Sequence, residues 1–168
     1  MKKYIYFWGH QTSKSYVGKE CMSQWYSSKF TIDNVEYANC EQFMMDKKAN
    51  LFNDIESSKK IRLCSDPRKV KELGRGVKNF NAEIWDEHKF DIVVKGNYAK
   101  FVQNDDLKNY LLSTNDAILV EASPYDKIWG VGLRASDPLI LNESTWKGEN
   151  LLGKALMQVR NDLYYGQF

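Results

Sequence analysis

The chain has 168 residues, of which 43% are hydrophobic and 27% charged, and its formal net charge is +2. These values predict one globular domain spanning residues 1–168, and so small a net charge gives no bulk electrostatic indication of nucleic-acid binding. No apolar run is long enough for a membrane span, and three cysteines without a CxxC spacing indicate a reducing, cytoplasmic setting rather than a disulfide framework.

The predicted elements alternate between short strands and helices. Residues 3–8 have strand-like alternation, and residues 29–32 and 35–37 predict a hairpin around Asp33 and Asn34. Helical spacing of apolar residues then predicts helices at 40–52, 57–64, 66–73, 82–103 and 105–112. A strand at 117–121, a long loop at 122–149 and a last helix at 151–164 complete the chain. The pattern indicates an α+β fold, a single compact domain with several helices around a small mixed sheet.

The first predicted helix carries two charged residues on one face. Glu41 and Lys48 are seven residues apart, which is two helical turns. Phe43, Met44 and Ala49 crowd the same turns, so either charge can be partly buried. A partly desolvated lysine has a lowered pKa and can act as a nucleophile or Schiff-base former. The same spacing also suits a solvated Glu–Lys surface, and spacing alone leaves both interpretations open.

The strand at 117–121 leads into a loop that is rich in reactive side chains. Glu121 and Asp126 supply carboxylates, Ser123 supplies a hydroxyl, and Trp129 is followed by Gly130. Loops at strand ends often carry sites, a tryptophan offers a stacking face, and a glycine allows a ligand to approach the backbone closely. The alternative is an ordinary turn with a core tryptophan.

Two further segments could bind an anion. Asn150 is placed to cap the last helix, whose first N–H groups could hold a phosphate. Arg75 lies between two glycines and could bind phosphate with its forked guanidinium. A plain helix cap is the alternative for Asn150. With only two histidines, we expect no metal site, and no motif indicates a cofactor.

Taken together, these segments resemble the NADAR family, which includes the YbiA-like N-glycosidases. The matching motifs lie in the same order over nearly the whole chain: Glu41–Ala49, Leu73–Arg75, Trp85, Asn97–Phe101, Leu119–Ser123, Asp126–Gly130, and Trp146–Gly153 with Leu156–Arg160. The chain departs from the family at Ser23–Tyr26, where many members read Ser-Asn-Phe, so substrate detail can differ there.

The resemblance implies hydrolysis of the bond between ribose C1 and an exocyclic amine of a base. The favoured substrate is ADP-ribosylated guanine in DNA or RNA, with ADP-ribose as the product and a cognate ADP-ribosyltransferase toxin as an expected partner. One alternative is an N-glycosidase on riboflavin-biosynthesis intermediates, the phosphoribosylamino pyrimidines. Another is a non-catalytic binder of ADP-ribose or an NAD-like nucleotide.

The resemblance also implies roles for individual residues. Lys48 matches the lysine thought to form a Schiff base with the sugar, and Glu41 or Asp126 would transfer protons. A carboxylate pair with direct attack by water is the rival mechanism. The expected substrate-binding residues are those that stack on the ligand, hold its phosphate or line the pocket: Trp85, Trp129, Gly130, Arg75, Glu121, Ser123 and Asn150.

Overall fold

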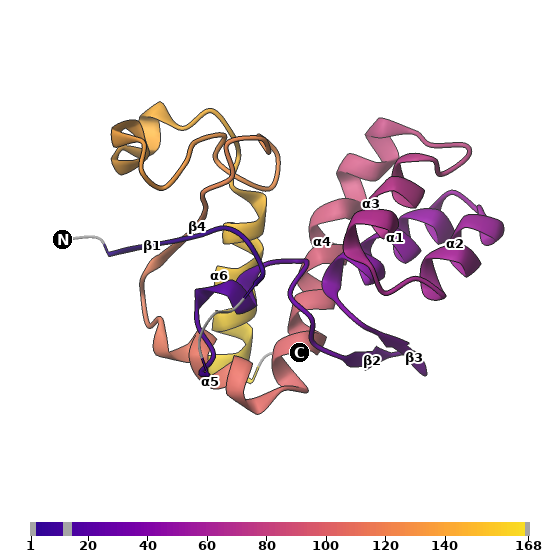
Figure 1. Ribbon diagram of the computed structural model, residues 1–168, viewed down its shortest axis with the longest axis horizontal. Coiled ribbons are helices and arrows are strands. Elements are labelled where there is room, and N and C mark those ends of the chain that lie inside the picture. The colour runs from indigo at the N-terminus through magenta and orange to yellow at the C-terminus, as the bar shows by residue number, and fades with distance from the viewer. Residues whose placement is uncertain (1–2, 12–14, 167–168) are drawn as a thin grey trace. The chain divides into compact units, whose positions relative to one another are not determined.

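A computed structural model describes residues 3–11 and 15–166, so both ends of the predicted domain 1–168 lie outside the described residues. The chain divides into two compact units: unit 1 contains residues 1–23 and 105–168, and unit 2 contains residues 24–104. The α+β class is confirmed, because the described part contains six α-helices and two small sheets (Figure 1). The expectation of a single domain stays a prediction.

Unit 2 begins with the predicted hairpin. Strands β2 (Phe30–Ile32) and β3 (Val35–Tyr37) pair antiparallel, and both residues of the connecting turn, Asp33 and Asn34, have positive φ angles of 52° and 62°. A two-residue turn of this kind matches the twist of the strands that it joins.

Four helices follow the hairpin in unit 2: α1 (Cys40–Leu51), α2 (Ile55–Arg62), α3 (Pro67–Arg75) and α4 (Ala82–Val102). Helix α1 packs against all three of the others, so it is the centre of the unit (Figure 1). An asparagine or aspartate side chain just before each helix accepts one of its first backbone N–H groups, which fixes where the helix begins.

Helix α4 is buried mainly along its C-terminal half. Val93, Asn97 and Phe101 are buried there. Apolar spacing makes five residues candidates for the inner face of this helix: Ile84, Trp85, His88, Ile92 and Tyr98. Ile84 and His88 are exposed, and the other three are half-buried. The prediction was wrong for Ile84 and His88 because the first turns of α4 extend beyond the core of the unit. The accessible first turns carry Trp85, which is half-buried.

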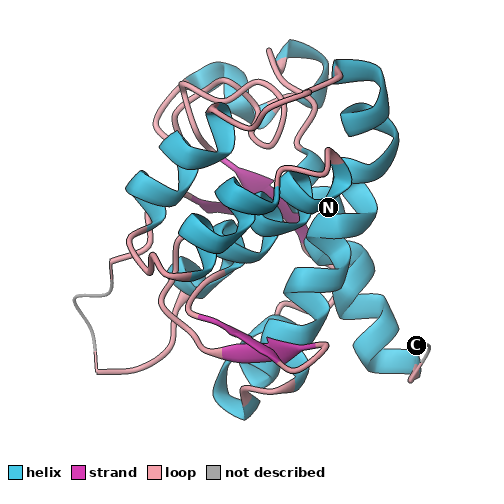
Figure 2. Cartoon of the chain, turned by 90° about the vertical axis from the view of Figure 1, so that its right-hand side faces the viewer, coloured by secondary structure: helices cyan, strands magenta, loops and turns pink. Residues whose placement is uncertain are grey.

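In unit 1, strand β1 (Tyr4–Phe7) pairs parallel with β4 (Ile118–Glu121). The strands therefore form two sheets of two strands each rather than one mixed sheet, as the magenta strands of Figure 2 show. The unit also contains α5 (Asp105–Ser113), α6 (Leu151–Tyr165) and three short 3-10 helices at Lys19–Met22, Pro138–Leu141 and Glu143–Thr145. Two of these lie in the predicted loop 122–149, which packs on β4 through Val131, Leu133 and Ile140.

Candidate functional site

Lys48 lies in the last turn of α1, where a carbonyl oxygen and two aromatic rings surround its amine. Its Nζ donates a hydrogen bond to the carbonyl oxygen of Gly74, 2.8 Å away at the end of α3. The ring centroids of Phe80 and Trp85 lie 4.4 Å and 5.6 Å from the same nitrogen. The amine therefore contacts one carbonyl oxygen and two aromatic rings.

Burial of Lys48 shifts its amine toward the uncharged form. Burial lowers the pKa of the Lys48 ammonium, and the Glu41 carboxylate opposes this shift from the same helix. The Glu41 side chain is only 4% exposed and Lys48 is half-buried, so the predicted partial burial of this pair is confirmed. A lysine with a lowered pKa has more free amine near neutral pH than an ordinary surface lysine.

A close helix contact places the Gly74 carbonyl beside Lys48. A Cβ atom at Gly74 would overlap Sδ of Met45, so only glycine lets α3 approach α1 this closely. Arg75 follows at once, and its exposed guanidinium forms no ion pair with any residue in the described part of the chain. Lys48 and Arg75, which the sequence predicted separately, are thus linked through Gly74, the residue just before Arg75 and 26 residues after Lys48.

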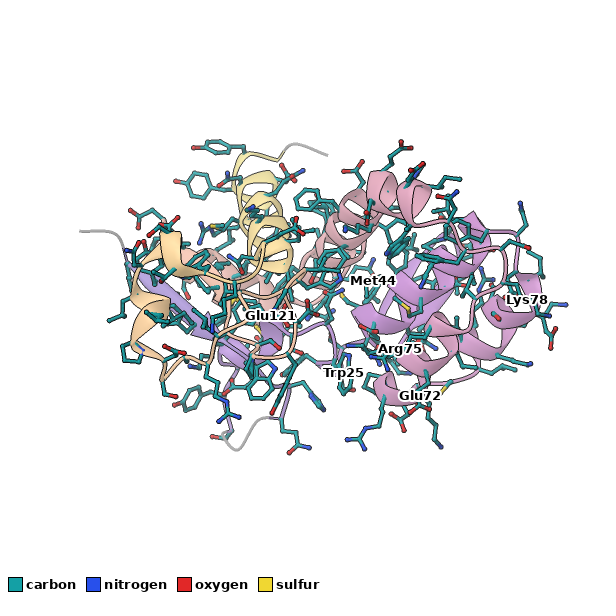
Figure 3. The ribbon with its side chains drawn as sticks, turned by 90° about the horizontal axis from the view of Figure 1, so that it is seen from above. Trp25, Met44, Glu72, Arg75, Lys78 and Glu121 are labelled. Carbon is teal, nitrogen blue, oxygen red and sulfur yellow. The ribbon has the colours of Figure 1, made fainter. Side chains whose placement is uncertain are left out.

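Two aromatic residues at this site were not among the predicted site residues. Phe80 is 47% exposed and lies over Lys48, and its ring also packs edge-on against Phe52 at 5.3 Å. Trp25 lies alongside α3, where Nζ of Lys71 is 5.9 Å from its ring, and Figure 3 labels it together with Arg75. For Phe80 the available signal was a large aromatic residue in a polar stretch between predicted elements. Trp25 lies in the segment Ser23–Tyr26, where the sequence already departs from the family pattern.

In unit 1, Asp126 holds its own loop. Its Oδ1 accepts hydrogen bonds from the backbone N–H groups of Ile128, at 2.9 Å, and Trp129, at 2.7 Å. Its carbonyl oxygen accepts from Gly132 at 3.1 Å. One carboxylate oxygen of Asp126 is therefore already committed to the turn that presents Trp129, which is half-buried.

Gly130 is needed by the loop itself. A Cβ atom there would lie 2.9 Å from the carbonyl oxygen of Glu121 and 3.0 Å from that of Asp126. Ser123, next to this contact, is buried, and its Oγ accepts from the Tyr125 N–H at 3.3 Å. The glycine at 130 thus lets the loop close onto the end of β4, and this packing accounts for it without a ligand.

The prediction that the Asn150 side chain caps α6 was wrong. Asn150 has a left-handed φ of 54°, and this turns its amide away from the helix. Its Oδ1 accepts from the Glu121 N–H at 3.0 Å, and its Nδ2 donates to the Leu119 carbonyl at 2.9 Å. The amide therefore fastens β4 to the start of α6.

The first N–H groups of α6 are also occupied. The Leu151 N–H donates to the Ile128 carbonyl oxygen and the Leu152 N–H to the Trp129 carbonyl oxygen, both at 3.1 Å. An anion would have to displace these bonds, so the geometry does not support the predicted phosphate site at this helix start.

The predicted site residues thus form two local groups, one in each unit. Unit 2 contains Lys48, Glu41, Arg75 and Trp85. Unit 1 contains Glu121, Ser123, Asp126, Trp129, Gly130 and Asn150. Within residues 3–11 and 15–166, no group of three or more His, Cys, Asp or Glu side chains is placed to hold a metal ion. The same residues include no helix that is both long and apolar enough to cross a membrane.

Comparisons with known proteins identify the family of the chain. The model of the NADAR domain matches residues 6–164. N-glycosidase R617 of Acanthamoeba polyphaga mimivirus is 48% identical over 165 residues, which are 95% of this chain and 96% of that protein. The chloroplastic riboflavin biosynthesis protein PYRR of Arabidopsis thaliana is 34% identical over 130 residues, which are 71% of this chain and 20% of that protein.

A solved structure supports the same assignment. The NMR structure of the E. coli protein YbiA aligns with a TM-score of 0.79 at 26% identity, covering 99% of this chain and 89% of that chain. The relatives define a hydrolase that acts on N-glycosyl bonds, and the fold agrees with them. The chain belongs to the NADAR family.

Proposed function

We propose that this N-glycosidase releases ADP-ribose from ADP-ribosylated guanine in DNA or RNA, with Lys48 as the nucleophile. The observation that carries the proposal is the enclosed amine of Lys48, whose pKa is lowered by burial. A free amine can attack ribose C1, whereas an ammonium cannot.

The proposed reaction uses the Lys48 amine and consumes one water molecule. The glycosylamine opens, so that O4′ of the ribose gains a proton and C1 forms an imine with the base nitrogen. Lys48 Nζ then adds to C1, a proton moves from Nζ to the base nitrogen, and the bond from C1 to the base breaks. Water adds to the resulting Lys48 Schiff base, which releases the sugar and restores the amine.

Glu41 is the better candidate than Asp126 for moving these protons. It shares a helix face with Lys48, and its charge acts on the Lys48 pKa. Asp126 instead bonds two backbone N–H groups of its own turn. We therefore expect Glu41→Gln to lower kcat strongly and Asp126→Ala, which removes the oxygen that accepts both N–H groups, chiefly to lower stability.

The test of the nucleophile compares adjacent lysines. Lys48→Ala should abolish release of ADP-ribose, whereas Lys47→Ala, one residue earlier on α1, should retain it. Borohydride added during turnover should leave a sugar adduct on the wild-type protein, read by mass spectrometry, and none on Lys48→Ala. Near-normal turnover by a folded Lys48→Ala would refute the Schiff base and favour direct attack by water.

The second candidate substrate is a phosphoribosylamino pyrimidine. It is favoured by the similarity to a plant riboflavin biosynthesis protein. Its ribose C1 also carries an exocyclic amine, so the same lysine chemistry applies. Parallel incubation with ADP-ribosyl-guanine DNA and with the pyrimidine distinguishes the two by the sugar released. The cytoplasmic location and a cognate toxin stay predictions.

A further inference from the structure

We propose that unit 1 carries a phosphate-binding pocket on the loop 122–149, centred on Arg134 and Lys147, which binds a phosphate ester of a nucleotide. The pocket has a volume of about 510 Å³, within the range of small-ligand sites. Its walls include Pro124, Gly132 and Asp137 besides the two cations, and all of its lining residues belong to unit 1.

Cationic side chains gather at this pocket without ion-pair partners. Arg134 and Lys147 line it, and both are exposed. The stem of Lys127 is also adjacent, because a Cβ atom at Gly132 would lie 3.2 Å from Lys127 Cγ and 3.1 Å from Lys147 Cβ. None of the three forms an ion pair within residues 3–11 and 15–166.

The two carboxylates near the pocket accept hydrogen bonds from backbone N–H groups. Asp137, in the pocket wall, accepts the Leu139 N–H at 3.0 Å and so begins a 3-10 helix. Asp126 accepts two N–H groups of its turn. Three cations beside two carboxylates that are engaged by the backbone leave the pocket positively charged, which favours an anion.

The backbone behind the pocket is fixed before any ligand binds. Gly132 is buried with a left-handed φ of 69°, a conformation that L side chains rarely adopt. The Lys147 N–H donates to the Val131 carbonyl at 2.9 Å, which ties the two sides of the pocket together. Cations on a fixed frame lose less entropy on binding than cations on a free loop.

An exposed pair of aromatic rings adjoins the pocket wall along the chain and favours a nucleotide over a bare anion. Tyr125 follows Pro124 directly and is 78% exposed, and Trp8, just after β1, is 54% exposed. Their ring centroids are 6.1 Å apart. Exposed Trp and Tyr rings next to cations are typical of surfaces that stack bases and bind their phosphates.

The kind of nucleotide that we expect in this pocket rests on the proposed function. The binding experiment that tests the pocket does not require the proposed reaction to occur. The phosphate could belong to ADP-ribose itself or to the backbone of the nucleic acid around the modified guanine. Two probes are used, ADP and a short single-stranded DNA, neither of them ADP-ribosylated. Their binding is measured by fluorescence anisotropy of a labelled probe and by its displacement with the unlabelled one. Neither probe is hydrolysed, so a failure of binding is distinguishable from a failure of the proposed reaction.

The test compares two double variants with the same loss of charge. Arg134→Gln with Lys147→Gln should weaken binding of at least one probe about tenfold, since two exposed charge contacts are lost. If the probe is DNA, the slope of log K against log salt should flatten by about 1.4. Lys19→Gln with Lys108→Gln, which removes two cations of unit 1 outside the pocket, should leave binding nearly unchanged.

The outcomes separate the sources of the phosphate. A loss confined to ADP assigns the pocket to the diphosphate of the substrate, and a loss confined to DNA assigns it to the strand. Equal losses in both double variants, or none in either, would overturn the proposal. Unchanged thermal melting of the pocket variant, expected for two exposed side chains, excludes unfolding as the cause.

Discussion

The hydrogen bonds of Asn150 predict that this residue acts on stability, although its sequence position resembles that of a phosphate-binding cap. Asn150→Gly keeps the left-handed backbone available and removes the two side-chain bonds to β4. The variant therefore isolates the contribution of the amide.

The expected magnitude follows from the two groups left behind. The Glu121 N–H and the Leu119 carbonyl each lose a partner, and an unsatisfied buried group costs about 1–3 kcal/mol. We expect Asn150→Gly to lower the free energy of unfolding by about 2–4 kcal/mol, the lower end applying if water fills the vacated space. Asn150→Ala should lose about 1 kcal/mol more, because alanine disfavours a positive φ.

Urea unfolding measures this effect, with Asn115→Gly as the matched control. Asn115 also has a positive φ, 52°, but is exposed, so the control should stay within about 0.5 kcal/mol of the wild type. If Asn150→Gly is as stable as the control but binds ADP-ribose more weakly, the reasoning is refuted and Asn150 contacts the ligand.

Three further substitutions test the surroundings of Lys48. Gly74→Ala should destabilise the protein by about 1–3 kcal/mol in urea, because its Cβ would overlap Met45; an unchanged midpoint would contradict the close contact. Phe80→Ala admits water to Lys48 and raises its lowered pKa, so the rising limb of kcat/KM against pH should move to higher pH; a shift to lower pH would contradict burial as the cause. Asp46→Asn removes a fully buried carboxylate from a network of four donors and should cost about 2–4 kcal/mol, which thermal unfolding would show.

Local signals predicted most of the elements. Asp66 and Pro67 mark the start of α3 as observed, and the Asp33–Asn34 turn forms the expected hairpin. These features depend on a few adjacent residues, so a single sequence contains enough information to find them. The prediction that Asn150 caps α6 failed because its contacts are not local. The left-handed backbone of Asn150 turns its side chain toward a strand about 30 residues earlier, and no adjacent residue indicates this.

The candidate site was predictable in its reactive residues but not in their surroundings. Helical spacing singled out Glu41 and Lys48 as a pair on one face, and the resemblance to the NADAR family then favoured them as catalytic residues over a solvated surface pair. The Gly74 carbonyl and the Phe80 ring were not, since both reach Lys48 through the packing of α3 and α4 on α1. Tertiary contacts of this kind have no period in the sequence.

The polar residues of α1 explain how the site stays in place. Nε2 of Gln42, a buried side chain, donates to three carbonyl oxygens around the end of α2, at 2.9 to 3.1 Å, and Asp46 accepts from Arg62 and Ser58 of that helix. Such bonds fix the rotation of α1 about its axis more strictly than apolar contacts do, because each has one geometry. The motif Glu41–Ala49 therefore combines two kinds of residue. Gln42 and Asp46 set the orientation of the helix, and that orientation brings Lys48 to the Gly74 carbonyl at the end of α3.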